Sequence, residues 1–310
     1  MNKKTYLIEK AEKGLTIQQY LKQIAGFSNA QIRSMKFTEN GICLGGQRAR
    51  VTTRLSEGDV LEVLLETKNS SSAHLLSFEQ MPDILYEDAD VIAVNKPAGM
   101  AVHPSHGHYQ DTLANQLAYY FRKNTQQVEI HSIGRLDLET SGIVLFAKHR
   151  AAAARLSRQR EDGRLQKTYL AICSGIFAEK NGTLNGPIAH LPGSLMKMCV
   201  SKDGKPAVTH YQVQKQYMEA ALVQLTLETG RTHQIRVHMA DAGHPLIGDR
   251  LYFADTDQKA DVDAENCFTG IKRAALHASR ICFYQPFEGK RITVEAPFPE
   301  DMKKCLFRDE

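Results

Sequence analysis

The chain has 310 residues, of which 42% are apolar, and a formal net charge of +4. This length exceeds one typical domain, and the apolar fraction is ordinary for a globular protein with a real core. No apolar run is long enough to cross a bilayer, and the first ten residues lack the apolar stretch of a secretion signal. The six cysteines include no C-x-x-C pair, which argues against a disulfide framework and a cysteine zinc site. We therefore expect a soluble, cytoplasmic protein.

Positive charge is concentrated in two parts of the chain. Residues 1–68 hold 11 Lys and Arg against 7 Asp and Glu, a surplus equal to the net charge of the whole chain. Residues 148–168 hold seven basic residues against two acidic ones. Together the two patches favour a polyanionic partner, although either patch alone is more typical of a solvated helix face.

The first predicted domain spans residues 1–68 and begins with two short helices. Apolar residues recur at helical spacing from Ile17 to Ile24, and Ser28 is a suitable N-cap for a second helix that continues through Met35. Residues 40–65 then predict short strands joined by glycine turns. Two helices followed by a small sheet form a compact module.

This order of elements resembles the alpha-L (S4-type) RNA-binding motif, which presents basic side chains to structured RNA. The resemblance implies that phosphate contacts are made by a set of lysines and arginines in this module: Lys22, Arg33, Lys36, Arg48 and Arg50. A purely structural appendage is the alternative. A polar, serine-rich linker at residues 69–76 separates this module from a second domain at residues 77–310.

The second domain predicts more strands than helices. A helix follows Asp111, which we expect to be its N-cap, with an apolar stripe formed by Leu113, Leu117 and Phe121. The helices are too few and too irregular for a repeated βαβ series. We therefore expect an α+β fold with a mixed, mostly antiparallel sheet flanked by helices. The predicted strands are residues 84–86, 91–94, 142–148, 167–173, 208–214, 221–228, 278–284 and 291–295.

Several familiar chemistries find no support in the sequence. Three close histidines, His103, His106 and His108, have no carboxylate or cysteine at ligand spacing, so we expect no metal site there. The acidic run at residues 254–266 lacks the glycine and closing glutamate of a calcium loop. Phosphate-binding glycine loops, dinucleotide fingerprints and serine-hydrolase elbows are also absent from the sequence.

Four ordered blocks carry a family resemblance between about residue 84 and residue 298. They read VIAVNKPAGMAVHPS, GRLDLETSGIVLFAK, KTYLAI and TGRTHQIRVHMADAGHPLIGDRLY. Together they resemble the RluA family of pseudouridine synthases. The resemblance implies isomerisation of specific uridines in structured ribosomal or transfer RNA, with no cofactor and no metal. Nothing in the sequence demands more than a monomer.

The resemblance also implies roles for individual residues. Asp137 matches the nucleophile, and Arg236 matches the arginine that pairs with it, with Arg231 as second choice for that pairing and as an RNA contact. Tyr169 would stack on the uracil and could remove the proton from the ring carbon after the new bond forms. The base role is the weaker of the two, because a phenol with a pKa near 10 is scarcely ionised at neutral pH. Arg135 would face the RNA and fill the gap left by an extracted base. A structural ion pair for the arginines and a core position for Tyr169 are the alternatives.

One position departs from the family pattern. Where the family usually has histidine before Arg-Leu-Asp, this chain has Gly134, which places RNA specificity in question more than activity. Two rival functions therefore stay open. One is a catalytically inactive RNA-binding or ribosome-assembly protein on the same fold, and the other is a glycosidase that releases uracil from RNA.

Overall fold

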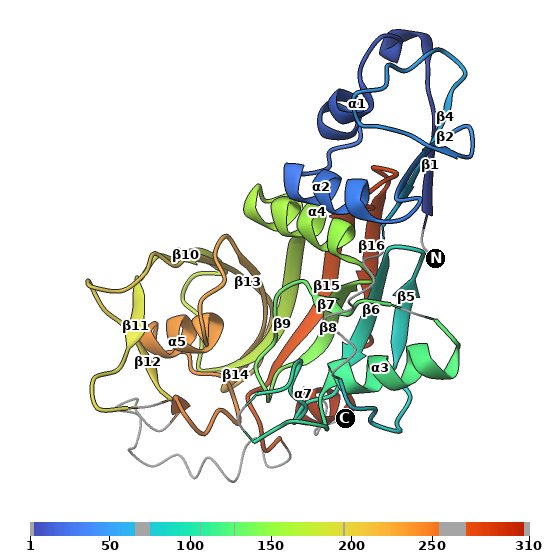
Figure 1. Cartoon of the computed structure of the whole chain (residues 1–310). Coiled ribbons are helices and arrows are strands. Elements are labelled where there is room, and N and C mark those ends of the chain that lie inside the picture. Colours follow the sequence, from blue (N-terminus) through green and yellow to red (C-terminus); the bar gives the residue numbers. More distant parts are fainter. Residues whose placement is uncertain are drawn as a thin grey trace.

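The computed structural model describes most of the chain, namely residues 3–65, 75–105, 107–126, 128–194, 196–253 and 271–306. Most of the predicted linker, residues 69–76, lies outside these ranges. The described strands form a four-stranded sheet, a ten-stranded sheet and a two-stranded sheet. Figure 1 shows the four-stranded sheet in a small N-terminal module above the large sheet.

The N-terminal module contains the two predicted helices, α1 (Ile17–Gln23) and α2 (Asn29–Phe37). Each begins with a capping box. The hydroxyl of Thr16 or Ser28 accepts a hydrogen bond from the backbone N–H three residues later, which would otherwise have no partner within the helix. The sheet has the strand order β1-β4-β2-β3, and its strands are β1 (Lys3–Leu7), β2 (Ile42–Leu44), β3 (Gln47–Arg48) and β4 (Val60–Leu64). The first strand was not predicted, because its two lysines give no apolar alternation.

The large sheet has the main strand order β10-β13-β14-β9-β15-β8-β6-β5, with β16 beside β15 and β7 beside β8. All of its pairs are antiparallel except β15 with β8. This arrangement confirms the predicted α+β class with a mixed, mostly antiparallel sheet. The strands are β5 (Ile84–Glu87), β6 (Val91–Lys96), β7 (His131–Ser132), β8 (Ser141–Ala147), β9 (Gln166–Ser174), β10 (Asn181–Leu184), β13 (Thr209–Gln216), β14 (Ala220–Leu227), β15 (Leu276–Tyr284) and β16 (Arg291–Glu295).

The remaining elements surround this sheet. A separate hairpin pairs β11 (Ile188–His190) with β12 (Met198–Val200). The helices are α3 (Leu113–Lys123), α4 (Arg150–Glu161), α5 (Gln234–Asp241) and α7 (Glu300–Leu306), and a short 3-10 turn covers Lys10–Glu12. The short strands β7, β10, β11 and β12 were not predicted, because segments this brief carry little periodic signal.

The N-cap of α3 differs from the prediction. The hydroxyl of Thr112, rather than the carboxylate of Asp111, accepts the hydrogen bond from the backbone N–H of Asn115. The Asp111 carboxylate instead contacts His108 Nδ1 at 2.7 Å. Thr112 is fully buried and Asp111 is exposed, so the helix begins one residue later than the acidic cap would require.

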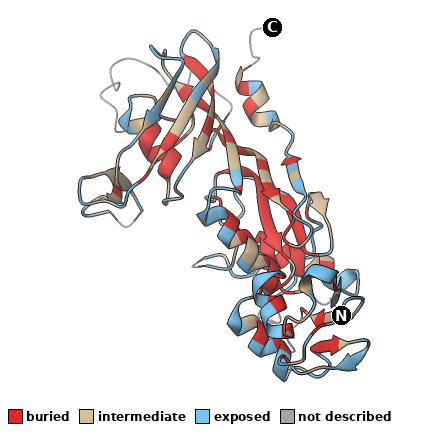
Figure 2. Cartoon of the chain, turned by 90° about the horizontal axis from the view of Figure 1, so that it is seen from above, coloured by how far each residue is buried: buried red, intermediate tan, exposed pale blue. Residues whose placement is uncertain are grey.

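Strand β8 is buried on both faces and organises two hydrophobic layers. Val144 and Phe146 face the layer that contains α3 and α5, whereas Ile143 and Leu145 face the layer that contains α4. Side chains alternate between the faces of a strand, so a continuous apolar run is required for such a central position. The strands in the middle of the sheet are accordingly buried in Figure 2.

The N-terminal module packs on α4, and its hydrophobic core includes Ala151 of that helix. The guanidinium of Arg155 lies 4.0 Å from the ring centre of Phe287 and 5.1 Å from that of Phe27. Lys4 of β1 reaches Asp90 of the large domain, with its Nζ 2.9 Å from Oδ2. The module and the large domain are therefore joined by apolar, stacking and ionic contacts.

Asp90 is fully buried and accepts hydrogen bonds from three side chains. Besides Lys4, His149 Nε2 lies 2.9 Å from Oδ1, and Gln285 Nε2 donates to Oδ2 at 2.6 Å. Burial alone would raise the pKa of Asp90, but these hydrogen bonds outweigh it and lower the pKa to about 2.

Among the described residues, no helix is long and apolar enough to span a membrane.

We expect Asp90→Asn to weaken the attachment of the N-terminal module. The folded-state pKa lies below the ordinary value of 3.8, so the carboxylate stabilises the fold above about pH 4 and loses this effect as the pH falls towards 2. At neutral pH the variant should lose on the order of 2 kcal/mol of unfolding free energy. Urea denaturation across this pH range should show that the difference in unfolding free energy between the variant and the wild type becomes smaller below about pH 4. The exposed Asp203→Asn serves as control. A difference in unfolding free energy that stays the same at low pH would contradict the role of the buried carboxylate.

Candidate active site

Asp137 lies in the loop between β7 and β8, in a turn closed by a hydrogen bond from Thr140 N to Asp137 O. Its side chain is 22% exposed. Its neighbour Leu136 is buried in the core, whereas Arg135 is exposed. Because the buried side chain of Leu136 anchors the loop to the core, the position of the Asp137 carboxylate is fixed.

The loop is held from below by Lys96, a completely buried lysine at the end of β6. Its Nζ donates to three backbone carbonyls, those of Pro97 at 2.9 Å, Met100 at 2.8 Å and Leu138 at 3.1 Å. The Gly99 N–H also donates to the Leu138 carbonyl, at 2.8 Å. These contacts connect the NKPAG segment directly to the residue that follows Asp137.

A second support comes from Arg273, which precedes β15. Arg273 Nη1 donates to the Glu139 carbonyl at 3.3 Å, and its Nε and Nη2 contact the carboxylate of Asp301 at 2.7 and 3.0 Å. The backbone N–H of Ala274 also donates to Glu139 Oε2. The aspartate turn is thus fixed by hydrogen bonds from both of its sides.

Arg236 projects from α5 and is 5% exposed. The start of α5 is fastened to β13 by Gln234, whose Nε2 donates to the Val208 carbonyl and to Thr209 Oγ1. One turn later, His238 contacts the same Thr209 hydroxyl at 2.9 Å. These buried polar contacts fix the rotation of the helix and hence the direction of the arginine.

The strongest partner of Arg236 is Asp249, a fully buried acid that the sequence analysis did not single out. Nε lies 2.6 Å from Asp249 Oδ2 and Nη2 lies 2.7 Å from Oδ1, which is a bidentate pair. Burial alone would lower the pKa of Arg236, but hydrogen bonding and the charge of Asp249 raise it. The ring centre of Tyr252 lies 5.1 Å from the guanidinium carbon.

The contact of Arg236 with Asp137 is longer than its contact with Asp249. Nη1 of the arginine lies 4.0 Å from Asp137 Oδ2, and Nη2 lies 3.8 Å from Glu139 Oε2. The bidentate pair of Arg236 is formed with Asp249, which is fully buried. Its position inside the TGRTHQIR…GDRLY block was the available signal.

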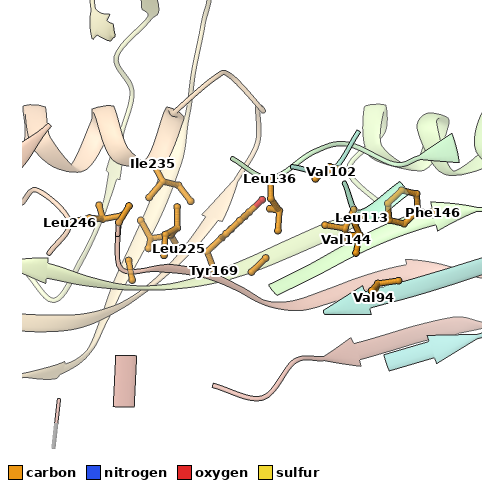
Figure 3. Packing of buried hydrophobic residues seen from close by; sticks show 14 of the residues in the cluster. Val94, Val102, Leu113, Leu136, Val144, Phe146, Tyr169, Leu225, Ile235 and Leu246 are labelled. Carbon is orange, nitrogen blue, oxygen red and sulfur yellow. The ribbon is translucent and has the colours of Figure 1, made fainter. Parts of the chain in front are cut away.

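Tyr169 lies on β9 and is 7% exposed. Figure 3 shows its ring between Leu225 and Leu136, with the hydroxyl directed towards Leu136. Burial, together with the charge of Asp137, raises the pKa of Tyr169 far above its ordinary value. The structure therefore brings Tyr169, Asp137 and Arg236 into one site, with a phenol that stays protonated at neutral pH.

The two further arginines of the predicted site take different contacts. Arg135 Nη2 donates to Thr232 Oγ1 at 2.8 Å, which links the aspartate loop to the TGRTH segment. In the part of the chain that the structure describes, Arg135 forms no ion pair with Asp137 or Glu139. Arg231 Nε donates to the Pro206 carbonyl at 3.0 Å and the residue is exposed. Neither arginine replaces Arg236 beside the aspartate.

The predicted RNA contacts of the N-terminal module are all exposed, and no ion pair involves them within the described ranges: Lys22, Arg33, Lys36, Arg48 and Arg50. Arg48 Nη2 donates to the Lys36 carbonyl at 3.3 Å, which connects β3 to the end of α2. Lys36 Nζ lies 5.5 Å from the ring centre of Phe37, which is 72% exposed. Basic and aromatic groups therefore occur together on this module.

The two described histidines of the histidine loop, His103 and His108, have different partners. The ring of His103 packs against Phe146, His108 contacts Asp111, and His106 lies outside the described residues. Over the described ranges, no group of three or more His, Cys, Asp or Glu side chains could hold a metal ion. The whole acidic run at residues 254–266 lies outside the residues that the structure describes.

Comparisons with known proteins agree on one family. Residues 90–241 match the family model described as RNA pseudouridylate synthase. The chain is 39% identical to the uncharacterised RNA pseudouridine synthase YhcT of Bacillus subtilis (strain 168), over 80% of this chain and 78% of the relative. It is 38% identical to ribosomal large subunit pseudouridine synthase D of Neisseria meningitidis serogroup A, over 85% and 67%. The solved structure of human RNA pseudouridylate synthase domain containing 1 is 27% identical, with a TM-score of 0.56, over 77% of this chain and 90% of that one.

We expect Asp249→Asn to destabilise the site strongly. Removing one partner of a buried ion pair leaves an uncompensated charge, which costs about 3–5 kcal/mol. Glu139→Gln is the matched control, because Glu139 also approaches Arg236 but is one-third exposed, and its loss should cost under about 1 kcal/mol. Chemical denaturation measures both values. Equal effects of the two substitutions would contradict the assignment of Asp249 as the principal partner.

Proposed function

The chain belongs to the RNA pseudouridine synthase family and isomerises uridine to pseudouridine in RNA, and on this premise we propose that Asp137 is its nucleophile. The isomerisation breaks the bond from the sugar to N1 of uracil and forms a bond from the sugar to C5. The hydrogen on C5 leaves as a proton and N1 gains one, so no electrons are exchanged. The chemistry thus asks only for a group that holds the separated fragments, which supports an enzyme without a cofactor.

A carboxylate meets this need by forming a covalent bond to the nucleoside, at the base or at the sugar, and releasing it after the base has turned. Asp137 is a partly exposed acid that faces a buried arginine. The single observation that carries the proposal is that Asp249 forms the bidentate ion pair with Nε and Nη2 of Arg236. The remaining nitrogen can offset the charge of Asp137 from 4.0 Å without locking its oxygens in a second bidentate pair.

Tyr169 is proposed as a platform for the uracil. Its ring is fixed between core residues, and aromatic faces stack on any base. The raised pKa of Tyr169 keeps its hydroxyl protonated, so stacking and hydrogen bonding are favoured over proton abstraction. The nearly complete burial of the ring also limits where a base can lie, directly beside Asp137.

Arg135 is proposed as the residue that faces the RNA as the target base leaves its stack. It is exposed, two residues before Asp137, and its guanidinium is held by Thr232. Extraction of a base costs a few kcal/mol, and a planar cation inserted in the gap offsets part of that cost. Arg231, also exposed, is proposed as a second RNA contact on the same rim.

The N-terminal module is proposed as an S4-type RNA-binding domain. The two helices, the small sheet and the five exposed cations described above support this assignment. The Neisseria relative is named as a ribosomal large subunit enzyme, which favours large-subunit ribosomal RNA over transfer RNA as the substrate. A ribosomal substrate supports a cytoplasmic location, and we propose that one chain, acting as a monomer, suffices for the reaction.

We expect Asp137→Asn to abolish catalysis while RNA binding persists. RNA labelled with tritium on C5 of uracil should release tritium with the wild type and at least about a thousandfold more slowly with the variant. Glu139→Gln is again the matched control, because it removes a neighbouring acid near the same arginine, and it should keep activity within about tenfold. Wild-type rates in Asp137→Asn would contradict the mechanism.

The same assay separates the rival functions. A catalytically inactive RNA-binding protein releases no tritium from the labelled RNA. A glycosidase yields free uracil in place of an isomerised nucleotide. Chromatography of digested RNA distinguishes uracil from pseudouridine.

We expect Arg33→Gln and Lys36→Gln together to weaken RNA binding and its salt dependence. Each lost phosphate contact should reduce the slope of log affinity against log salt by about 0.7–0.9. Fluorescence anisotropy with a large-subunit rRNA transcript measures the slope, with Lys303→Gln on α7 as control. Point substitutions are preferable to deletion of residues 1–68, because deletion exposes Ala151 and Phe287. An unchanged slope would identify the module as structural.

A further inference from the structure

The basic stretch at residues 148–168 contains cations with very different surroundings. Lys148 pairs with Glu87 at 2.6 Å, Arg150 with Glu129 at 3.3 Å, and Arg164 with Asp162 at 2.6 Å. Arg155 is stacked between Phe27 and Phe287 at the junction with the N-terminal module. These four cations are used within the protein, so they do not explain a polyanion-binding surface.

Two of the remaining cations, Arg160 and Lys167, converge on one point. A Cβ atom built on Gly134 would lie 3.6 Å from Arg160 Nη1 and 3.8 Å from Lys167 Nζ. Arg160 belongs to the last turn of α4 and Lys167 to β9, so two separate elements deliver them. Over the described part of the chain, neither cation forms an ion pair or a side-chain hydrogen bond.

This arrangement is electrostatically unfavourable for the protein alone. Lys167 is half-buried, and burial together with the charge of Arg160 lowers the pKa of Lys167 to about 8. A cation in the last turn of a helix is favoured by the helix dipole, which accounts for Arg160. It does not account for Lys167, which lies on a strand. An anion between the two groups would relieve their repulsion and the desolvation of the lysine.

Gly134 leaves the space between these cations open. Its φ of +83° belongs to the left-handed region, where a side chain is strained, and a Cβ atom there would already be in van der Waals contact with both cationic groups. This is the position at which the chain departs from the usual histidine. Gly134 lies three positions before Asp137, a span of at most about 11 Å along an extended chain. Lys167 also precedes Tyr169 by two residues, so both side chains project from the same face of β9.

We infer that Arg160, Lys167 and the open space at Gly134 form a binding site for a backbone phosphate of the substrate RNA, next to the extracted nucleotide. The inference rests on the proposed function. Two converging cations without a carboxylate match the charge and the several acceptor oxygens of a phosphodiester. The RNA strand would then be held on one side of Arg135 by this site, while the target base enters between Asp137 and Tyr169.

The test compares two charge-removing variants with a matched control. Arg160→Gln and Lys167→Met remove the proposed contacts, whereas Arg164→Gln removes a cation of the same stretch that Asp162 already neutralises. Binding is measured by anisotropy in the full-length Asp137→Asn background, so that turnover does not enter. The probe is a large-subunit rRNA transcript that contains the uridine converted by the wild type.

Each of the two variants should weaken binding about tenfold and reduce the salt slope by about 1, while Arg164→Gln should stay within about twofold of the parent. Lys167→Arg should restore most of the affinity, because it retains the charge. If Lys167→Met fails to fold, the exposed Arg160→Gln decides alone. Variants that bind as tightly as the control would overturn the inference.

A neutral linkage in the RNA locates the phosphate. Single methylphosphonate substitutions are placed in turn at the phosphates flanking the target uridine. One of them should weaken binding by the parent about tenfold, and it should have no further effect on the double variant Arg160→Gln/Lys167→Met. If each methylphosphonate weakens binding by the double variant as much as it weakens binding by the parent, the proposed site is wrong.

Failure of this inference is distinguishable from failure of the proposed function. Tritium release by the wild type and its loss in Asp137→Asn test the reaction, whereas the anisotropy measurements test the phosphate contact. In the catalytically competent background, the substitutions should raise the RNA concentration at half-maximal rate and leave the single-turnover rate at saturation within about threefold. A lower saturated rate with unchanged binding would instead show that Lys167 only supports Tyr169.

Discussion

The buried ion pair between Arg236 and Asp249 is the contact on which the site depends. A guanidinium that is 5% exposed requires a fully desolvated partner, and the carboxylate of Asp249 meets two of its nitrogens at 2.6 and 2.7 Å. The pair fixes the guanidinium of Arg236 in the first turn of α5. Asp137 then faces this charge from 4.0 Å and keeps its oxygens partly exposed. One acid thus supplies structural neutralisation, which leaves the other available for chemistry.

The surrounding fold makes this geometry rigid. Strand β8 is packed on both faces, so the turn that precedes it starts from a fixed point. Lys96 and Arg273 hold the carbonyls of Leu138 and Glu139, the two residues that follow Asp137. A nucleophile positioned by such contacts does not have to be ordered when the substrate binds, which is the main advantage of a preorganised site.

The N-terminal module and α4 extend the same surface towards the RNA. Lys4 and Arg155 join the module to the large domain through Asp90 and Phe287, and this use removes their charges from any role in recognition. Within the described ranges, the exposed cations of the module and the two cations beside Gly134 form no ion pair. Sorting cations by their partners therefore separates those that hold the protein together from those available to a polyanion.

The sequence by itself determined the local features of this protein. Capping residues such as Ser28, the apolar run of β8 and the ordered family blocks predicted the helices, the central strands, the fold class and the reaction, because each signal lies within a few neighbouring residues. Only the tertiary structure decided which charges meet. Lys96 reaches a carbonyl 42 residues away, Asp249 forms the bidentate pair with Arg236 although the family resemblance implied Asp137 as the partner, and Thr112 caps α3 in place of Asp111. Such partners depend on distance and desolvation between remote segments, which no local pattern of residues encodes.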